Sequence, residues 1–215
     1  MKFDYIKCHG SGNEFVMVDA VKYDLQGVDL AEFARFICDR EYSLGADGVL
    51  LLVEREGIYG MRMFNPDGTE GEMCGNALRS VGKYVYDHAL TDKTDLVIET
   101  LGGMQKLNLT VEKRDAKDGE KLMPYKDRGF VSNIRANIGS PRLDTKVIPV
   151  NTNLPEFIER PVKVLDKIFN ITAVSWGNPH VVMFVDSVKD LDVEKYGKEI
   201  EYMTSLFPNK TNVTF

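Results

Sequence analysis

The residues of this chain that could do chemistry gather around one cysteine, Cys74. It lies in the run NPDGTEGEMCGNALR, residues 65–79, between a turn-rich loop and a segment whose apolar residues recur at helical spacings of three and four. The first backbone amides of a helix lack partners within it, and the helix dipole favours negative charge at that end. A thiolate is therefore stabilised there, and the amides of Gly75 and Asn76 can hold a substrate carboxylate. Cys74 is a candidate acid, base or nucleophile.

Asparagines in turn or loop settings form a second group of candidates, namely Asn13, Asn65, Asn76, Asn178 and Asn212. Turn chemistry alone accounts for each of them, because asparagine tolerates left-handed backbone and caps helices. Taken together with a cysteine, they indicate a pocket rich in neutral amides. Such a pocket could hold an ammonium and carboxylates without supplying a competing base. His180, in the loop after Pro179, is open to a structural or a functional interpretation.

The other two cysteines are interpreted as core residues. Cys38 lies on the apolar stripe expected of a helix over 30–38, and Cys8 ends an alternating first strand. Three cysteines at distant positions predict neither a disulfide framework nor a zinc site. The glycine-rich loop at 9–13 lacks both GxGxxG and the P-loop lysine pattern, and no carboxylates show a recognisable metal-ligand spacing. The residues therefore do not indicate a nucleotide-binding site or a metal site.

Composition excludes several classes of protein. The 215 residues are 43% hydrophobic and 28% charged, as in an ordinary globular protein that is long enough to bury a core. A net charge of −6 argues against sequence-independent nucleic-acid binding. The longest apolar runs, such as 49–53 and 181–185, have the length of strands and are too short to cross a bilayer. Because the first residues do not resemble a signal peptide, we expect a cytoplasmic protein without membrane or nucleic-acid partners.

Strand patterns interspersed with helices predict a mixed α/β chain, of α+β type, in two lobes. Helices are expected at 30–38, from 76 onward and at 192–203. Strands are expected at 2–7, 14–19, 49–54, 60–65, 95–100, 105–113, 131–138, 147–150, 171–174 and 181–185, with an irregular loop at 155–161. The charged, aperiodic stretch 114–128 marks the boundary. The expected lobes are therefore 1–128, which carries Cys74, and 129–215.

Five segments occur in the order seen in the diaminopimelate epimerase family, namely HGSGNEF, DREYSLGADGVL, NPDGTEGEMCGNALR, GNPHVV and FPNKTNV. The chain resembles this family over essentially its whole length. The resemblance implies two structurally similar α/β lobes, each with mixed sheets around a helix, and a cleft between them to which each lobe contributes one cysteine. It also implies an isomerase without a cofactor, which interconverts LL- and meso-diaminopimelate for lysine and peptidoglycan precursor synthesis. The partner would be this small amino acid, and the resemblance also allows a homodimer.

The resemblance implies a role for each candidate residue at a matching position. Cys74 corresponds to the catalytic thiol of the first lobe. The substrate's amino and carboxyl groups would be bound by Asn13, Asn65, Asn178 and Asn212. The backbone amides of Gly75 and Asn76 would face a substrate carboxylate, and His180 would lie near the site and tune the thiol pair.

One feature of the family is missing from this sequence. Inversion needs a base on one face of the α-carbon and an acid on the other, and the family takes its second thiol from a later segment ending in ACGTG. No such segment occurs here, so we expect the second lobe to be truncated before that cysteine and the 215-residue chain alone to be inactive. The family's usual CGNG is also CGNA here, with Ala77. Two alternatives stay open, a racemase of another amino acid such as histidine and a fragment that binds an amino acid without turning it over.

Overall fold

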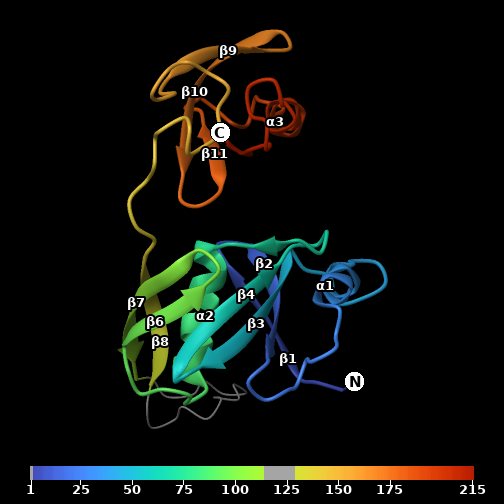
Figure 1. The fold of residues 1–215 in the computed structure, drawn as a ribbon, viewed down its shortest axis with the longest axis vertical. Helices are drawn as coiled ribbons and strands as arrows, with labels where there is room; N and C mark the ends of the chain where they lie inside the picture. The colour runs from blue at the N-terminus through green and yellow to red at the C-terminus, as the bar shows by residue number, and fades with distance from the viewer. Residues whose placement is uncertain (1, 114–128) are drawn as a thin grey trace. The chain divides into compact units, whose positions relative to one another are not determined.

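The computed structural model describes residues 2–113 and 129–215, and the chain forms two compact units, Met1–Ile138 and Gly139–Phe215 (Figure 1). The stretch 114–128, which the sequence marked as the boundary, lies outside the described residues. The division falls later than the 128/129 boundary expected from the sequence, because the strand that follows the stretch pairs with the first sheet. We call residues 1–138 the first unit and residues 139–215 the second unit.

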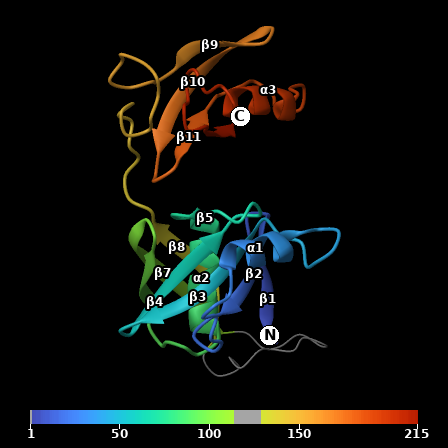
Figure 2. The same cartoon turned by 45° about the vertical axis from the view of Figure 1, so that its right-hand side comes forward.

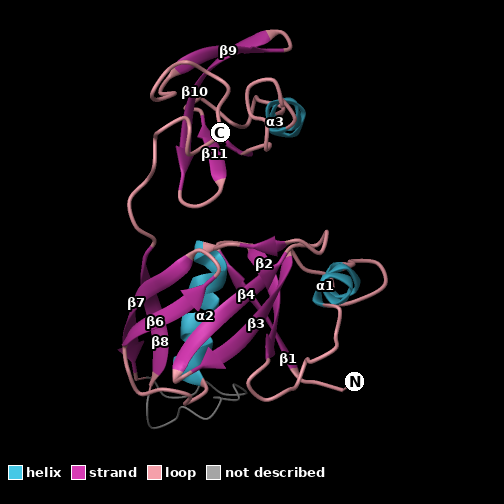
Figure 3. Ribbon diagram, in the orientation of Figure 1, coloured by secondary structure: helices cyan, strands magenta, loops and turns pink. Residues whose placement is uncertain are grey.

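Within the described residues, the first unit contains an eight-stranded mixed sheet in which seven strands follow the order β1-β2-β3-β4-β6-β7-β8 and β5 pairs with β4. The β2–β3 and β4–β6 pairs are parallel, and the other pairs are antiparallel. The strands are β1 (Tyr5–Gly10), β2 (Asn13–Asp19), β3 (Gly48–Arg55), β4 (Ile58–Phe64), β5 (Glu70–Gly71), β6 (Asp95–Thr100), β7 (Gly103–Glu112) and β8 (Phe130–Asn137). Figure 3 shows how strongly strands dominate this unit.

Helix α2 (Gly75–Asp87) is the centre around which the sheet curls. It contacts β1 and β8, which lie at opposite ends of the strand order, so the sheet must curve around it. Its buried residues include Leu78, Val81 and Val85, which are among the apolar residues at spacings of three and four that predicted a helix after Cys74. They pack with Phe15, Leu50, Ile98 and other strand residues in one apolar core.

Helix α1 (Leu30–Cys38) packs on the other face of the central strands (Figure 2). Along β2 and β3 the buried side chains alternate, with Phe15 and Leu50 in the core around α2 and Val16 and Leu51 in the core around α1. The carboxylate of Asp29 caps α1 by accepting from the amides of its first turn. Because both faces of β2 are covered, its register is firmly set, and the position of its first residue, Asn13, is set with it.

The second unit holds a four-stranded sheet, within the described residues, in the order β12-β11-β10-β9. Its strands are β9 (Arg160–Val164), β10 (Lys167–Ser175), β11 (Pro179–Val182) and β12 (Asn212–Thr214). Helix α3 (Val193–Glu201) buries Tyr196 and Ile200 against this sheet, in a core with Ile171 and Val181. None of the helices in residues 2–113 and 129–215 combines the length and the apolar character that crossing a membrane requires.

The mixed α/β class and most of the expected elements are confirmed, and three expectations about elements need correction. The strand expected at 131–138 exists as β8, but it belongs to the sheet of the first unit. The strand expected at 147–150 is wrong: the segment forms turns, in which the amides of Val147 and Ile148 both donate to the carbonyl of Asp144. The short strands β5, β9 and β12 were missed, and β9 begins inside the loop expected at 155–161.

Candidate functional site

Cys74 is the N-cap residue of α2, which confirms the expected place of the thiol just before a helix. Its backbone is extended, with φ −139° and ψ 119°, and its carbonyl accepts the amide of Leu78 at 2.8 Å. The sulfur does not cap the helix, and the first turn of this described helix carries no acidic residue. The positive end of the helix dipole is thus not neutralised by a side chain of its own first turn, and it acts on the half-buried Cys74.

Asn13 brings an amide oxygen to this thiol. The Sγ of Cys74 donates to Asn13 Oδ1 over 3.7 Å, and the side-chain nitrogen of Asn76 donates to the same oxygen over 3.4 Å. Asn13 follows a two-residue hairpin turn in which Ser11 and Gly12 both have positive φ, 53° and 84°. The turn therefore delivers the first residue of β2 to the start of α2.

The hairpin and the helix meet at Gly10. A Cβ at this position would lie 3.1 Å from both Cβ and the carbonyl oxygen of Asn76, so any larger residue would push the hairpin and the helix apart by a few tenths of an ångström. Arg79 adds a polar contact between the same parts, because its guanidinium donates to Asn76 Oδ1 at 2.5 Å and to Ser11 Oγ at 3.4 Å. Both ends of the Asn76 side-chain amide are therefore occupied, which leaves its backbone amide as the group that could meet a ligand.

Asn65 lies in the turn between β4 and β5. Its side-chain nitrogen donates to Thr69 Oγ1 at 2.9 Å, and its backbone amide donates to the Thr69 carbonyl at 2.8 Å. These are the hydrogen bonds of a turn, as the general preference of asparagine for turns predicts. The structure thus brings together Cys74, Asn13 and Asn76, whereas the side-chain hydrogen bond of Asn65 goes to its own turn.

The three candidates of the second unit form a group of their own. His180 Nε2 lies 3.0 Å from Asn178 Oδ1, and the side-chain nitrogen of Asn212 donates to the carbonyl of Pro179 at 3.0 Å. His180 on β11 and Asn212 on β12 are directly paired in the sheet register. Burial lowers the pKa of His180, so this imidazole is neutral at pH 7.

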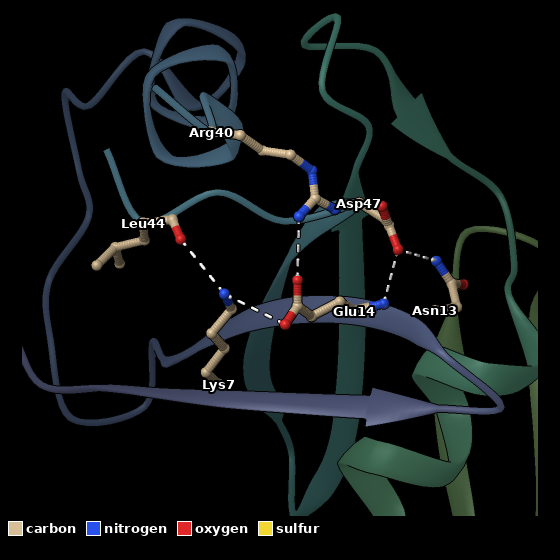
Figure 4. Close-up of polar contacts among 6 residues, drawn as sticks. All are labelled: Lys7, Asn13, Glu14, Arg40, Leu44 and Asp47. Atoms are coloured by element: carbon tan, nitrogen blue, oxygen red, sulfur yellow. Dashed lines mark hydrogen bonds and ion pairs between the residues drawn. The ribbon is translucent and has the colours of Figure 1, made fainter. Parts of the chain in front are cut away.

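Asp47 is a residue of the site to which sequence reasoning gave no role. Its Oδ2 accepts from Asn13 Nδ2 at 3.2 Å and from the Glu14 amide at 2.8 Å, while its Oδ1 accepts from Arg40 at 2.8 Å (Figure 4). The Glu14 amide lowers the pKa of this carboxyl most; burial raises it by less, and the hydrogen bonds from Asn13 and Arg40 lower it further, so the pKa lies below its usual value. The only signal in the sequence was that Asp47 lies in the GADG part of a matching segment.

The other two cysteines belong to apolar cores. Cys8 packs against the core around α2, and Cys38 is buried in the core around α1. Burial raises the pKa of both thiols, which disfavours their thiolates. Among residues 2–113 and 129–215, no group of three or more His, Cys, Asp or Glu side chains lies close enough together to hold a metal ion.

Comparison with known proteins gives one family. The family model described as diaminopimelate epimerase matches residues 5–123. A diaminopimelate epimerase of Methanococcus maripaludis is 38% identical over 216 residues, which cover 100% of this chain and 71% of that protein. A diaminopimelate epimerase of Carboxydothermus hydrogenoformans is 41% identical, over 99% of this chain and 70% of its own length.

Two solved structures share the fold at low sequence identity. A PhzF-family phenazine biosynthesis protein of Bacillus anthracis has a TM-score of 0.57 and 20% identity, covering 97% of this chain and 64% of its own. A probable proline racemase of Agrobacterium radiobacter has a TM-score of 0.58 and 12% identity, covering 94% of this chain and 55% of its own. At these identities the likeness concerns the fold alone.

Proposed function

The chain belongs to the diaminopimelate epimerase family, and from this premise we propose that it takes part in interconverting LL- and meso-diaminopimelate. The reaction moves the proton at the α-carbon and uses no pyridoxal phosphate, metal or nucleotide. The observation that carries the proposal is the thiol of Cys74 at the N-terminus of α2, half-buried and held by an amide oxygen. The product serves lysine and peptidoglycan precursor synthesis in the cytoplasm.

We propose that Cys74 exchanges a proton with the α-carbon of the substrate. As a thiolate it takes the α-proton, so that an S–H bond forms and the electron pair stays on the carbon; in the reverse direction its thiol returns a proton. The developing negative charge lies next to the substrate carboxylate. The amides of Gly75 and Asn76 and the dipole of α2 would stabilise both charges, because they are already oriented before the reaction begins.

Inversion needs a second acid or base on the opposite face of the carbon. Cys8 and Cys38 are poor candidates because burial in apolar cores raises the pKa of both. We propose that the second thiol belongs to the part of the relatives' length that this chain, which covers 71% of the M. maripaludis protein, does not span. The second unit would then be the part of the family's second lobe that this chain contains.

We propose that the remaining asparagines bind the same substrate. Asn13 and Asn65 of the first unit, and Asn178 and Asn212 of the second, would hydrogen-bond its amino and carboxyl groups. His180 would tune the thiol pair as a neutral hydrogen-bonding group, because burial lowers its pKa. The pairing of His180 with Asn212 across β11 and β12 supports a shared role for these two residues.

The test is an epimerisation assay on two polypeptides, the 215-residue chain and the product of the whole open reading frame that encodes it. Each is incubated with LL-diaminopimelate and, separately, with L-histidine, and the stereoisomers are separated by chiral chromatography. We expect the meso isomer from the whole gene product and little or none from the 215-residue chain. Rapid inversion by the 215-residue chain would contradict the need for a thiol outside it. Turnover of histidine but not of diaminopimelate would show that the substrate assignment is wrong.

A further inference from the structure

We infer that Asp47 is a positioning residue that turns the side-chain amide of Asn13 so that its oxygen, and not its nitrogen, faces Cys74. The inference concerns the hydrogen bonds around Asn13 and does not need a substrate. Its consequence for catalysis rests on the proposed function, because there Cys74 must hold and release a proton.

The orientation of Asn13 follows from the chemistry of its neighbours. An ionised carboxylate can only accept hydrogen bonds, so the NH2 group of Asn13 must face Asp47 Oδ2, 3.2 Å away. The side-chain nitrogen of Asn76 can only donate, so the Asn13 oxygen must face it, 3.4 Å away. Turning the amide by half a turn would set oxygen against oxygen on one side and nitrogen against nitrogen on the other. Both neighbours therefore select the same orientation.

Asp47 is itself held by both β2 and the segment after α1. Two hydrogen bonds join Asp47 to Glu14: the Asp47 backbone amide donates to the Glu14 carbonyl at 2.8 Å, and the Glu14 backbone amide donates to the Asp47 carboxylate at 2.8 Å. The Arg40 guanidinium lies 2.8 Å from Asp47 and 3.3 Å from Glu14. Gly45, with φ of 67°, lets the loop close on Arg40, since a Cβ there would lie 3.0 Å from Arg40 Cα.

The charges around Asp47 balance, and their exposure argues against a mainly stabilising role. Lys7 on β1 pairs with Glu14 at 3.2 Å, so two cations face two carboxylates (Figure 4). The side chains of Arg40 and Asp47 are 59% and 41% exposed, and ion pairs at such exposure contribute little to stability. Their main effect is therefore geometric: they fix where the Asp47 carboxylate points and keep it charged.

The orientation of Asn13 decides which form of Cys74 it favours. An oxygen beside the sulfur accepts the S–H proton and favours the thiol, whereas an NH2 group there would donate to the sulfur and favour the thiolate. The N-terminus of α2 favours the thiolate. Arg79 is the charged group of α2 in this cluster, and it reaches Asn76. Asp47 thus acts through Asn13 to oppose the helix dipole and keep a proton available at Cys74.

The test measures the alkylation of Cys74 by iodoacetamide between about pH 5.5 and 9.5, which spans the usual range of thiol titration. Peptide mass spectrometry follows Cys74 separately from Cys8 and Cys38 in the 215-residue chain. In Asp47→Asn the neighbour can donate or accept, so only Asn76 still selects the orientation of Asn13, and the amide turns in part of the molecules. We expect the midpoint of the Cys74 profile to move to lower pH by about half a unit, which makes alkylation about threefold faster on the acid side of the profile.

Asp19→Asn is the matched control, on the strand β2 that Asn13 begins. Asp19 ends β2, accepts the Val21 amide at 3.2 Å and the Tyr84 hydroxyl at 3.0 Å, and pairs with Lys22 at 2.8 Å. Like Asp47 it combines a backbone amide, a neutral side-chain donor and a cation, but none of its contacts involves Asn13 or Cys74. We expect its Cys74 profile to match that of the unchanged chain. Arg40→Gln, which keeps the carboxylate but removes its cation, serves if Asp47→Asn does not fold, and should shift the midpoint in the same direction by less.

A double substitution separates an effect through Asn13 from a general destabilisation of the first unit. In an Asn13→Ala background, Asp47→Asn should have no further effect on the Cys74 profile, because the amide through which it acts is gone. An unchanged midpoint in Asp47→Asn, a shift to higher pH, an equal shift in Asp19→Asn, or a full shift without Asn13 would each overturn the inference. None of these outcomes bears on the epimerase assay, and failure of that assay leaves this inference standing.

Discussion

Replacing Gly10 by alanine should separate the β1–β2 hairpin from α2 and move Asn13 away from Cys74. The added Cβ would lie 3.1 Å from Cβ and the carbonyl oxygen of Asn76 and 3.2 Å from its Cα. Helix backbone cannot rotate out of the way, so the hairpin must shift by a few tenths of an ångström. The hydrogen bonds from Asn76 and Cys74 to Asn13 are already long, at 3.4 and 3.7 Å, and such a shift would break them.

The expected cost is that of overpacking a closely packed contact, about 1–3 kcal/mol of unfolding free energy for the first unit. With a urea dependence of about 2 kcal/mol per molar, the unfolding midpoint falls by about 0.5–1.5 M. The probe must belong to the first unit. The reactivity of Cys38 toward a thiol reagent is such a probe, because this cysteine is buried and is reached only when the first unit unfolds. The single tryptophan, Trp176, reports the second unit instead.

Gly197→Ala on α3 is the control for this substitution. Its Cβ would meet only Phe215, at 3.8 Å, which is ordinary contact, and alanine in a helix is favoured over glycine. We expect the stability of the second unit to stay the same or to rise by about 0.5–1 kcal/mol. If Gly10→Ala keeps the urea midpoint and the Cys74 alkylation rate of the unchanged chain, the close approach of hairpin and helix does not hold Asn13 in place.

Three further predictions concern stability and pH. Burial lowers the pKa of His180 below the 6.5 of an exposed histidine, so just below that pH the unfolded state binds more protons than the folded state. The urea midpoint of the second unit, followed by Trp176 fluorescence, should therefore fall as the pH drops from about 6.5. His180→Gln should remove this fall. The pKa of Asp47 is lowered, chiefly by the Glu14 amide, so its contribution to stability is present above about pH 4 and is lost below it. The protection of that amide against hydrogen exchange, relative to its intrinsic rate at each pH, should therefore fall on acidification, and in Asp47→Asn it should not change with pH. Gly68→Ala should destabilise the first unit by at least about 1 kcal/mol in the Cys38 assay, because φ is 86° and the new Cβ would lie 2.8 Å from the carbonyl oxygen of Ala31; an unchanged midpoint would contradict this.

The elements that could be predicted are those with a strong local signal. Leu78, Val81 and Val85 predict α2 because one side of that helix is buried in a single core, and the place of Cys74 follows from where the periodicity begins. The strand expected at 147–150 is wrong because Ile148 and Val150 are buried by the packing of a turn and not by a sheet. Short β-branched runs carry the same signal in both settings.

The polar contacts of the site could be predicted only in part. The residue types alone predicted asparagines near Cys74, and Asn13 and Asn76 do meet there. Which end of Asn13 faces the sulfur depends on Asp47, which lies far along the chain and reaches Asn13 only because β2 and β3 are parallel neighbours. The boundary between the units likewise depends on the pairing of β7 with β8, which spans the stretch 114–128 in the sequence.

The most direct test of the proposed chemistry is deuterium uptake from D2O at the α-carbon of meso-diaminopimelate, measured with the whole gene product and its cysteine variants. If Cys74 transfers the α-proton, Cys74→Ala loses inversion and solvent exchange at the face that this thiol serves, while Cys8→Ala and Cys38→Ala, if they fold, retain both. Near-normal exchange and inversion in a folded Cys74→Ala variant would remove Cys74 from the reaction, whatever its place at the start of α2.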